Sequence, residues 1–127
     1  MSDMIPVREI FAVAERALVK AGARPEAARS MAKAITAAER DGIASHGLAY
    51  LATYCEHLQC GKVVGAAVPA LTEPSPGAVV VDAGSGFAHP AIDLGLSRLL
   101  PVARKQGIAT LNIRNSYNCG VLGHHTE

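Results

Sequence analysis

Ser45 and His46 stand side by side in the segment D-G-I-A-S-H-G at residues 41–47. Histidine exchanges a proton near neutral pH, so a histidine next to a hydroxyl group could serve as a general acid or base. Two interpretations stay open on spacing alone: Ser45 is a relay partner of His46, or it only caps a helix. A hydrolase triad is not indicated, because adjacent side chains rarely face each other and no G-x-S-x-G elbow occurs.

A polar loop at residues 114–120 follows an expected strand. Ser116 and Asn118 offer hydrogen-bonding side chains there, and Cys119 offers a thiol. Ligands bind at the carboxyl ends of strands in α/β folds, so the loop could hold a substrate, and Cys119 could act as a nucleophile. The alternative is a polar turn closed by Gly120.

The run Gly84-Ser85-Gly86 lies between an expected strand and an expected helix, as a dinucleotide-binding loop would. However, His89 takes the place of the third glycine, and Arg114 ends the next strand where an acidic residue would be needed. The sequence therefore favours a plain turn.

The pair His124-His125 raises the question of a metal site. Adjacent histidines project in different directions, and no cysteine or acidic residue stands at the usual ligand spacing. We therefore expect no metal site.

The elements that would position these groups follow from hydrophobic spacing and from breaker residues. Four helices are predicted: 7–21, 25 to about 40, 45–59, and 90 to 107, the last kinked or broken at Pro101. Two strands are predicted at 78–82 and 108–113, and a strand, helix, strand order with so long a crossover implies a parallel pair. The segment 62–77 contains three prolines and is predicted to be an extended connector.

The predicted fold class is therefore α/β, with N-terminal helices followed by a β-α-β unit. We expect a helical region with its connector at residues 1–77 and the start of an α/β domain at residues 78–127. Because two strands are marginally stable alone, that domain is expected to be completed by residues outside this chain.

The composition excludes several classes of protein. Of 127 residues, 50% are hydrophobic and 18% are charged, which excludes an intrinsically disordered chain. A net charge of +1 argues against nucleic acid or an anionic membrane as the main partner. The chain has an odd number of cysteines (Cys55, Cys60 and Cys119), and it has neither a signal-like N-terminus nor a long apolar run. These features predict a reduced, cytoplasmic protein.

Three motifs occur in the order E-R-D-G-I-A-S-H-G-L (39–48), V-V-D-A-G-S-G (80–86) and I-R-N-S (113–116). Together they resemble the N-terminal part of the type-2 malate/L-lactate dehydrogenase family, which includes ureidoglycolate and sulfolactate dehydrogenases, diketogulonate reductase and cyclic imino acid reductases. The resemblance extends from the first helix to Gly120. It implies the non-Rossmann fold of sulfolactate dehydrogenase, NAD or NADP as cofactor, and a 2-oxo acid or cyclic imine as substrate.

The resemblance also assigns roles to particular residues. The family's serine-histidine pair corresponds to Ser45 and His46, which implies that His46 donates a proton with Ser45 in the relay. Ser116, Asn118 and Cys119 would contact the substrate, and Tyr50 would line its pocket.

Two positions depart from the family pattern. Many members carry Arg where this chain has Tyr50, and Tyr50 cannot form a charged fork with a carboxylate. Many carry a second histidine where this chain has Asn118, which cannot shuttle a proton at neutral pH. These departures favour a member that uses His46 alone, on an unusual oxo acid or imine.

Family members are more than twice as long as this chain, and most of their nicotinamide-binding residues lie beyond its last residue. We therefore expect a complementing C-terminal polypeptide and a homodimer or higher oligomer. The leading interpretation is the N-terminal segment of an NAD(P)-dependent reductase or dehydrogenase. The alternative is a catalytically degenerate relative that binds a metabolite or serves as a structural subunit.

Overall fold

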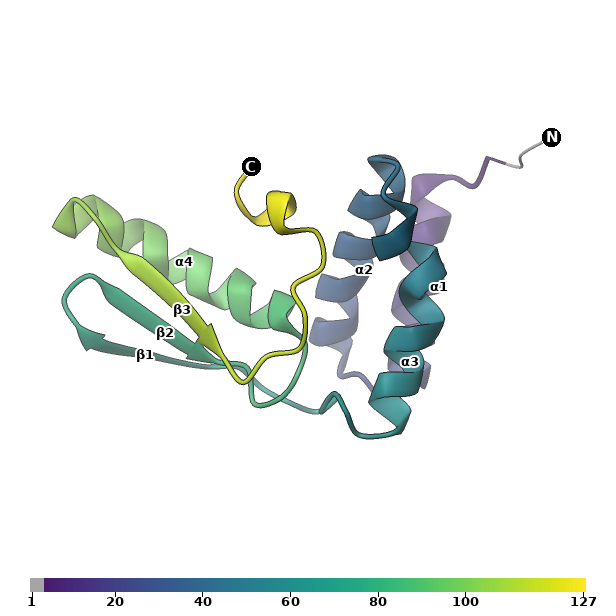
Figure 1. The fold of residues 1–127 in the computed structure, drawn as a ribbon, viewed down its shortest axis with the longest axis horizontal. Coiled ribbons are helices and arrows are strands. Elements are labelled where there is room, and N and C mark those ends of the chain that lie inside the picture. The colour runs from purple at the N-terminus through teal and green to yellow at the C-terminus, as the bar shows by residue number, and fades with distance from the viewer. Residues whose placement is uncertain (1–3) are drawn as a thin grey trace.

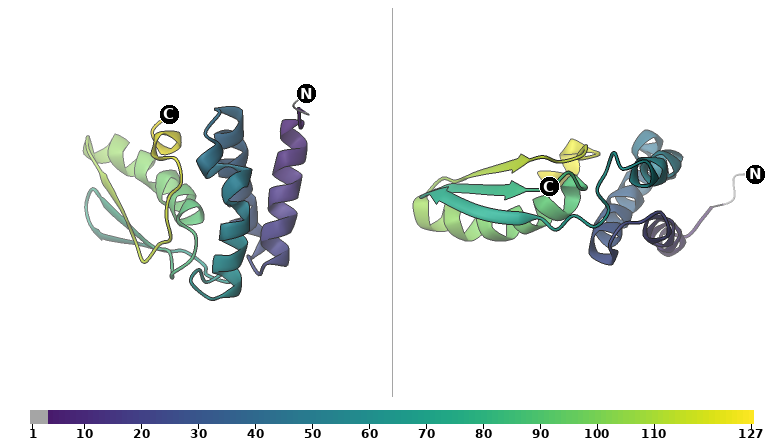
Figure 2. Two further views of the ribbon diagram at one scale, coloured as in Figure 1. Left: turned by 45° about the vertical axis from the view of Figure 1, so that its right-hand side comes forward. Right: turned by 90° about the horizontal axis from the view of Figure 1, so that it is seen from below.

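The computed structural model describes residues 4–127, which fold into a helical half and an α/β half (Figure 1). The helical half contains α1 (Val7–Lys20), α2 (Pro25–Arg40) and α3 (Leu51–Gln59), which stand beside one another in Figure 2. Helix α1 buries the stripe Ile10, Ala14 and Leu18, four residues apart, as the periodicity predicts. Helix α2 starts with proline at its first position, where the missing N–H has no cost.

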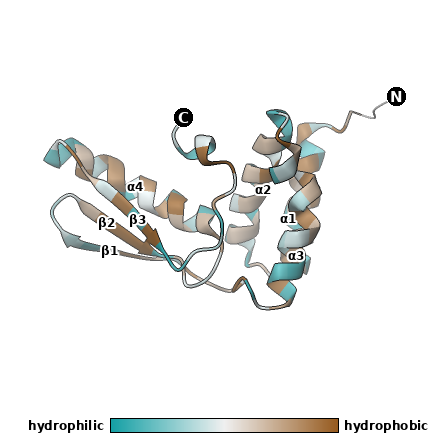
Figure 3. Cartoon of the chain, in the orientation of Figure 1, coloured by the Kyte–Doolittle hydropathy of each residue, from teal (hydrophilic) through white to brown (hydrophobic). Residues whose placement is uncertain are grey.

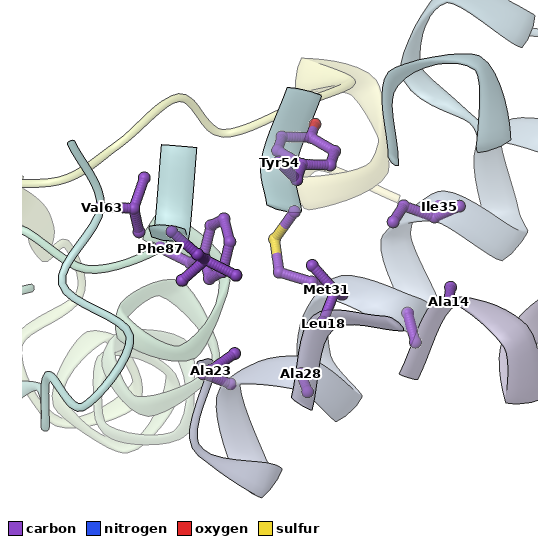
Figure 4. Close-up of a cluster of buried hydrophobic side chains, with 12 residues drawn as sticks. Ala14, Leu18, Ala23, Ala28, Met31, Ile35, Tyr54, Val63 and Phe87 are labelled. Atoms are coloured by element: carbon purple, nitrogen blue, oxygen red, sulfur yellow. The ribbon is translucent and has the colours of Figure 1, made fainter. Parts of the chain in front are cut away.

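Small side chains let the helices approach closely. Four of the buried residues of α2 are alanines. The volume between the helices is filled mainly by Leu18, Met31, Tyr54 and Phe87, which meet in one cluster (Figure 4). Phe87 comes from the α/β half, so this cluster joins the two halves of the molecule.

The α/β half is a sheet with one helix on one face. Its order is β1 (Ala70–Ser75), β2 (Ala78–Asp82) and β3 (Thr110–Arg114). Among residues 4–127, β3 has β2 as its neighbour on one side only. Strands β2 and β3 are parallel, which confirms the prediction, and α4 (Ala88–Gln106) makes the crossover. Val79 and Val81 of β2 are buried in the core beneath α4, and in Figure 3 the hydrophobic colour of β3 gives way to hydrophilic residues at the turn that follows it.

The predicted connector at 62–77 is wrong in its second half, because β1 lies there and pairs antiparallel with β2. Pro74 is tolerated because β1 is an edge strand and the pairing register shifts between Thr72 and Ser75. The sheet therefore begins before residue 78, while the division of the chain into domains stays a prediction.

The helix predicted from residue 45 is also wrong at its start. Two 3₁₀ turns, η1 (Ala44–His46) and η2 (Leu48–Tyr50), come before α3. Gly47 lies between them, and the Glu39 carboxylate of α2 accepts the Leu48 N–H at 2.6 Å. A Cβ at position 47 would collide with that carboxylate, so the path of the chain here is set by α2.

The last helix differs from its prediction in two respects. It begins at Ala88, two residues early, and it is not broken at Pro101, which is exposed to solvent. Strand β3 begins at Thr110 because Gly107 ends α4 with a positive φ and Ile108 is exposed. Over residues 4–127, none of the helices has both the length and the apolar character that a bilayer crossing requires.

Gly65 permits a close approach between the connector and the turn after α1. Its carbonyl accepts the Arg24 N–H at 2.9 Å, and a Cβ at position 65 would overlap the carbonyl group of Gly22. We expect Gly65→Ala to lower the free energy of unfolding by about 1–3 kcal/mol, the usual cost of overpacking. Urea denaturation measures it, with Gly123→Ala as the matched control, because a Cβ there meets nothing within 4 Å. Equal midpoints for the two variants would contradict the prediction.

Candidate active site

A cavity of about 300 Å³ opens between the helical half and the segment that follows β3. That segment runs back between the two halves of the molecule, as both views show (Figures 1 and 2). The cavity is lined by Ser45, His46, Tyr50, Tyr54, Asn118 and Gly120. The structure thus brings Ser45, His46 and Tyr50 together with Asn118, which is far away in the sequence.

Ser45 and His46 contact each other directly. Ser45 Oγ lies 3.0 Å from His46 Nδ1, although adjacent side chains were not expected to face each other. Both residues belong to the 3₁₀ turn η1. Ser45 does not cap a helix, because Ile43 and Tyr50 occupy the N-cap positions of η1 and α3. The capping interpretation is therefore wrong, and the hydroxyl is available to fix one tautomer of an exposed imidazole.

Two tyrosines one helical turn apart form an aromatic wall. The rings of Tyr50 and Tyr54 lie 4.8 Å apart in an edge-to-face arrangement. Burial, with a smaller effect of Tyr50, raises the pKa of Tyr54 to about 12, so its phenol stays protonated. Sequence reasoning missed Tyr54, although the spacing of four residues from Tyr50 places both on one face of a helix.

The loop after β3 contributes less than predicted. Asn118 lines the cavity, and its Oδ1 accepts the Gly120 N–H at 3.2 Å, which leaves the amide NH₂ group to donate. Ser116 is exposed, and neither Ser116 nor Cys119 is among the residues that line the cavity. The Cys119 carbonyl accepts a hydrogen bond from His125 Nε2 at 2.7 Å, which anchors the loop from behind.

The glycine loop at 84–86 joins the ends of β2 and β3. Its three backbone N–H groups donate to the Asp82 carboxylate at 2.8 Å, the Asn115 carbonyl at 2.7 Å and the Ala83 carbonyl at 2.9 Å. No amide of this loop is left to cradle a phosphate, in contrast to a dinucleotide-binding loop. The residues present do not fit a pyrophosphate, which supports the interpretation as a plain turn.

Four further histidines lie outside the cavity. His124 Nε2 lies 2.8 Å from Asp41 Oδ2, and His57 is hydrogen-bonded to the Tyr117 hydroxyl. His89 packs 5.3 Å from the ring of His125, and burial lowers its pKa to about 4. Within residues 4–127, no group of three or more His, Cys, Asp or Glu side chains is arranged to hold a metal ion.

The sequence profile of the malate/L-lactate dehydrogenase family matches residues 5–127. The chain belongs to this family. It is 41% identical over 127 residues to (2R)-3-sulfolactate dehydrogenase (NADP(+)) from Chromohalobacter salexigens, covering 100% of this chain and 38% of the relative. It is 38% identical over 121 residues to Delta(1)-pyrroline-2-carboxylate reductase from Ancylobacter novellus, covering 92% of this chain and 36% of that protein.

Solved structures of the family have the same fold. The crystal structure of delta1-piperideine-2-carboxylate reductase from Pseudomonas syringae matches with a TM-score of 0.95 and 34% identity, over 99% of this chain and 38% of that one. Sulfolactate dehydrogenase from Methanocaldococcus jannaschii matches with a TM-score of 0.86 at 21% identity, over 95% of this chain and 35% of that one. The chain spans less than two fifths of the length of these relatives and matches their N-terminal end.

Asp82 holds the loops at the ends of β2 and β3 together. Its Oδ2 accepts hydrogen bonds from Arg114 Nε and Asn115 Nδ2, both at 3.0 Å. The pKa of Asp82 is lowered below its ordinary value of 3.8. The largest cause is the hydrogen bond from the Gly84 N–H, and the Asn115 and Arg114 side chains contribute as well. A carboxyl group whose pKa is lowered by folding stabilises the fold above its ordinary pKa and loses that effect as the pH falls through the folded value.

We therefore expect Asp82→Asn to lower the urea midpoint at pH 7, and the difference from the parent to shrink steadily below pH 3.8. Glu56→Gln, at an exposed carboxylate of α3, is the control for a charge loss without these contacts. If the difference in urea midpoint between the parent and Asp82→Asn does not change with pH, the Asp82 carboxylate does not stabilise the fold in this way.

Proposed function

We propose that the chain is the N-terminal part of an NAD(P)-dependent oxidoreductase that reduces a 2-oxo acid or a cyclic imino acid, or oxidises the corresponding 2-hydroxy acid. The observation that carries the proposal is the Ser45–His46 hydrogen bond at the edge of a cavity lined by neutral donors. The two relatives compared above act on sulfolactate and on Delta(1)-pyrroline-2-carboxylate by their names, and both substrates carry a carboxylate beside the reacting carbon.

His46 is the proton donor in this proposal. The protonated imidazole has hydrogen on both nitrogens, so Nδ1–H donates to the Ser45 hydroxyl across 3.0 Å and Nε2–H is left to act as the acid. Nε2 then transfers its proton to the carbonyl oxygen or imine nitrogen as the carbon is reduced, and the neutral imidazole keeps its hydrogen on Nδ1. Because His46 is exposed, it exchanges protons with solvent directly and needs no internal proton path.

Substrate orientation falls to Tyr50 and Asn118. Both line the cavity and both donate hydrogen bonds without a formal charge. Ser116 and Cys119 stay candidates for substrate contact only if the loop moves, since neither lines the cavity.

A bound nicotinamide would supply the hydride. The glycine loop does not fit the pyrophosphate, so we assign no cofactor-binding role to residues of this chain and propose NAD or NADP without choosing between them. One relative is named as NADP(+)-dependent. We further propose a complementing C-terminal polypeptide, a homodimer or higher oligomer, and a cytoplasmic location consistent with three free cysteines.

Replacing His46 tests the central role. We expect His46→Ala in the complete enzyme to lower kcat by about 10²–10⁴-fold, the usual contribution of a general acid. Turnover is followed by NAD(P)H absorbance with pyruvate, sulfolactate and Delta(1)-pyrroline-2-carboxylate. Unchanged urea unfolding shows that the exposed side chain was removed without loss of the fold. Activity within a few-fold of the parent would remove His46 from this role.

A degenerate, non-catalytic relative is the second candidate. Its supporting observation is that, among residues 4–127, no lysine or arginine lines the cavity. The cavity therefore lacks the charged side chain that would bind the carboxylate of the substrate. Binding of these acids without turnover of any of them by the complete protein would favour this candidate.

Cys119 offers a rival chemistry as a thiol nucleophile. Because its side chain does not line the cavity, we expect Cys119→Ser to keep kcat/KM within about threefold of the parent. A loss of two orders of magnitude, measured in the same assay, would instead support the thiol mechanism.

A further inference from the structure

The adjacent residues His124 and His125 connect the turn η3 (Leu122–His125) to two separate segments of the chain. His124 Nε2 lies 2.8 Å from Asp41 Oδ2, which stands 83 residues earlier. His125 Nε2 lies 2.7 Å from the carbonyl oxygen of Cys119. In Figure 1 this turn follows the segment that runs back between the two halves of the molecule. The histidine pair therefore links the end of α2 to the loop after β3.

Both contacts have a fixed direction. A carbonyl oxygen can only accept a hydrogen bond, so His125 donates the hydrogen on its Nε2 to Cys119. Hydrogen bonds from Arg40, the larger effect, and from His124 lower the pKa of Asp41, so its carboxylate is ionised and also accepts. An Nε2 that carries hydrogen has no lone pair for a metal ion, which gives this pair of histidines a role other than metal binding.

The two partners lead to the two segments that line the candidate active site from far apart in the sequence. Cys119 stands between Asn118 and Gly120, and both of these residues line the cavity. Asp41 caps the end of α2 and begins the turn that leads to η1, which carries His46. The turn η3 therefore connects the segment with the proposed proton donor to the loop with the proposed substrate amide.

His89 of α4 packs against the same loop. Its ring lies 5.3 Å from the ring of His125, and a Cβ at position 120 would lie 3.3 Å from its Nε2. Gly120 has a φ of +63°, so the backbone passes close to the imidazole in a conformation that favours glycine. His89 is only 5% exposed. The loop is thus in contact with one imidazole and hydrogen-bonded to the next, which leaves it little room to move toward α4.

We propose that His124 and His125 form a histidine clamp that fixes the position of the Asn118 amide relative to the His46 proton donor. The proposal rests on the proposed function, because it concerns two groups of that same site. Both clamp histidines are positioning residues, since neither is among the cavity-lining residues that the structure describes. A misplacement of about 1 Å between a catalytic group and its substrate can lower the rate about 100-fold, so such a clamp affects turnover without touching the substrate.

The first experiment detects the two hydrogen bonds without any turnover. In the complete protein with ¹⁵N-labelled histidine, we expect NMR to show hydrogen on Nε2 of both His124 and His125. Each signal is assigned by its absence in His124→Gln or His125→Gln. Hydrogen on Nδ1 and none on Nε2 in either residue would overturn the proposal.

The second experiment locates the effect of each contact by hydrogen exchange and mass spectrometry of the complete protein. We expect His124→Leu to accelerate amide exchange about 2–10-fold in residues 41–47, and His125→Leu to do so in residues 117–120, as for one lost hydrogen bond. Thr126→Val is the matched control, because the Thr126 hydroxyl donates to the Gly123 carbonyl within the same turn. Acceleration over the whole chain, or none in these segments, would overturn the proposal.

The third experiment is a double-mutant cycle in the complete enzyme, with the oxo acid or imine that it turns over. We expect His125→Leu to lower kcat about 10–100-fold while KM rises no more than about threefold. His125→Gln keeps an amide donor for the Cys119 carbonyl and should stay within about threefold of the parent kcat. In an Asn118→Ala background, His125→Leu should cost little more. An equal loss of kcat in both backgrounds would show that His125 does not act through Asn118 and would overturn the proposal.

Failure of the proposed function gives a different pattern of results from failure of the clamp. If the complete protein turns over none of the acids, the proposed function fails, and the tautomers and the local exchange still decide whether the clamp exists. If turnover is found and His125→Leu keeps the parent kcat, the clamp is wrong while the proposed function stands.

Discussion

The packing of Tyr54 against three other aromatic rings holds the two halves of the molecule together. Its ring makes edge-to-face contacts with Tyr50 at 4.8 Å, Phe87 at 5.9 Å and Tyr117 at 6.1 Å. These partners come from the turn before α3, the start of α4 and the loop after β3. Because Tyr54 is only 2% exposed, no water competes for these contacts. Tyr54 therefore connects the turn that carries Tyr50 with the loop that carries Asn118.

The chain has few large side chains and places them where the cavity forms. It contains three tyrosines and two phenylalanines, and four of these five rings belong to the cluster around Tyr54. Elsewhere the helices pack through alanine, which lets backbones approach but buries little area per residue. The same rings that fill the core at this point also form the wall of the candidate site, so folding and site geometry are coupled there.

The sequence predicted the features that depend on local patterns. The apolar stripe of α1, the proline start of α2 and the parallel pair of β2 and β3 follow from periodicity and from connection length. The adjacency of Ser45 and His46 pointed to a segment that lines the cavity. Family membership was recognised from three short motifs, since their order and separation are specific even though each is short.

The features that were not predicted depend on residues far apart in the sequence. Glu39 binds the Leu48 N–H at the start of the second 3₁₀ turn, a contact that the pattern around residue 45 does not reveal. Strand β1 was missed because its proline suggests a connector unless the edge position is known. The contact of His57 with Tyr117 crosses 60 residues and has no signal in local spacing.

Strand β3 has a neighbour on one side only among residues 4–127. Its outer row of backbone amide and carbonyl groups is therefore a template on which a further strand can align. Added there, a strand would extend the sheet without rearranging β1, β2 or α4, because the parallel register of β3 is already fixed by five residue pairs with β2. The sheet is thus able to grow past Thr110–Arg114, immediately beside the loop that carries Asn118 into the cavity.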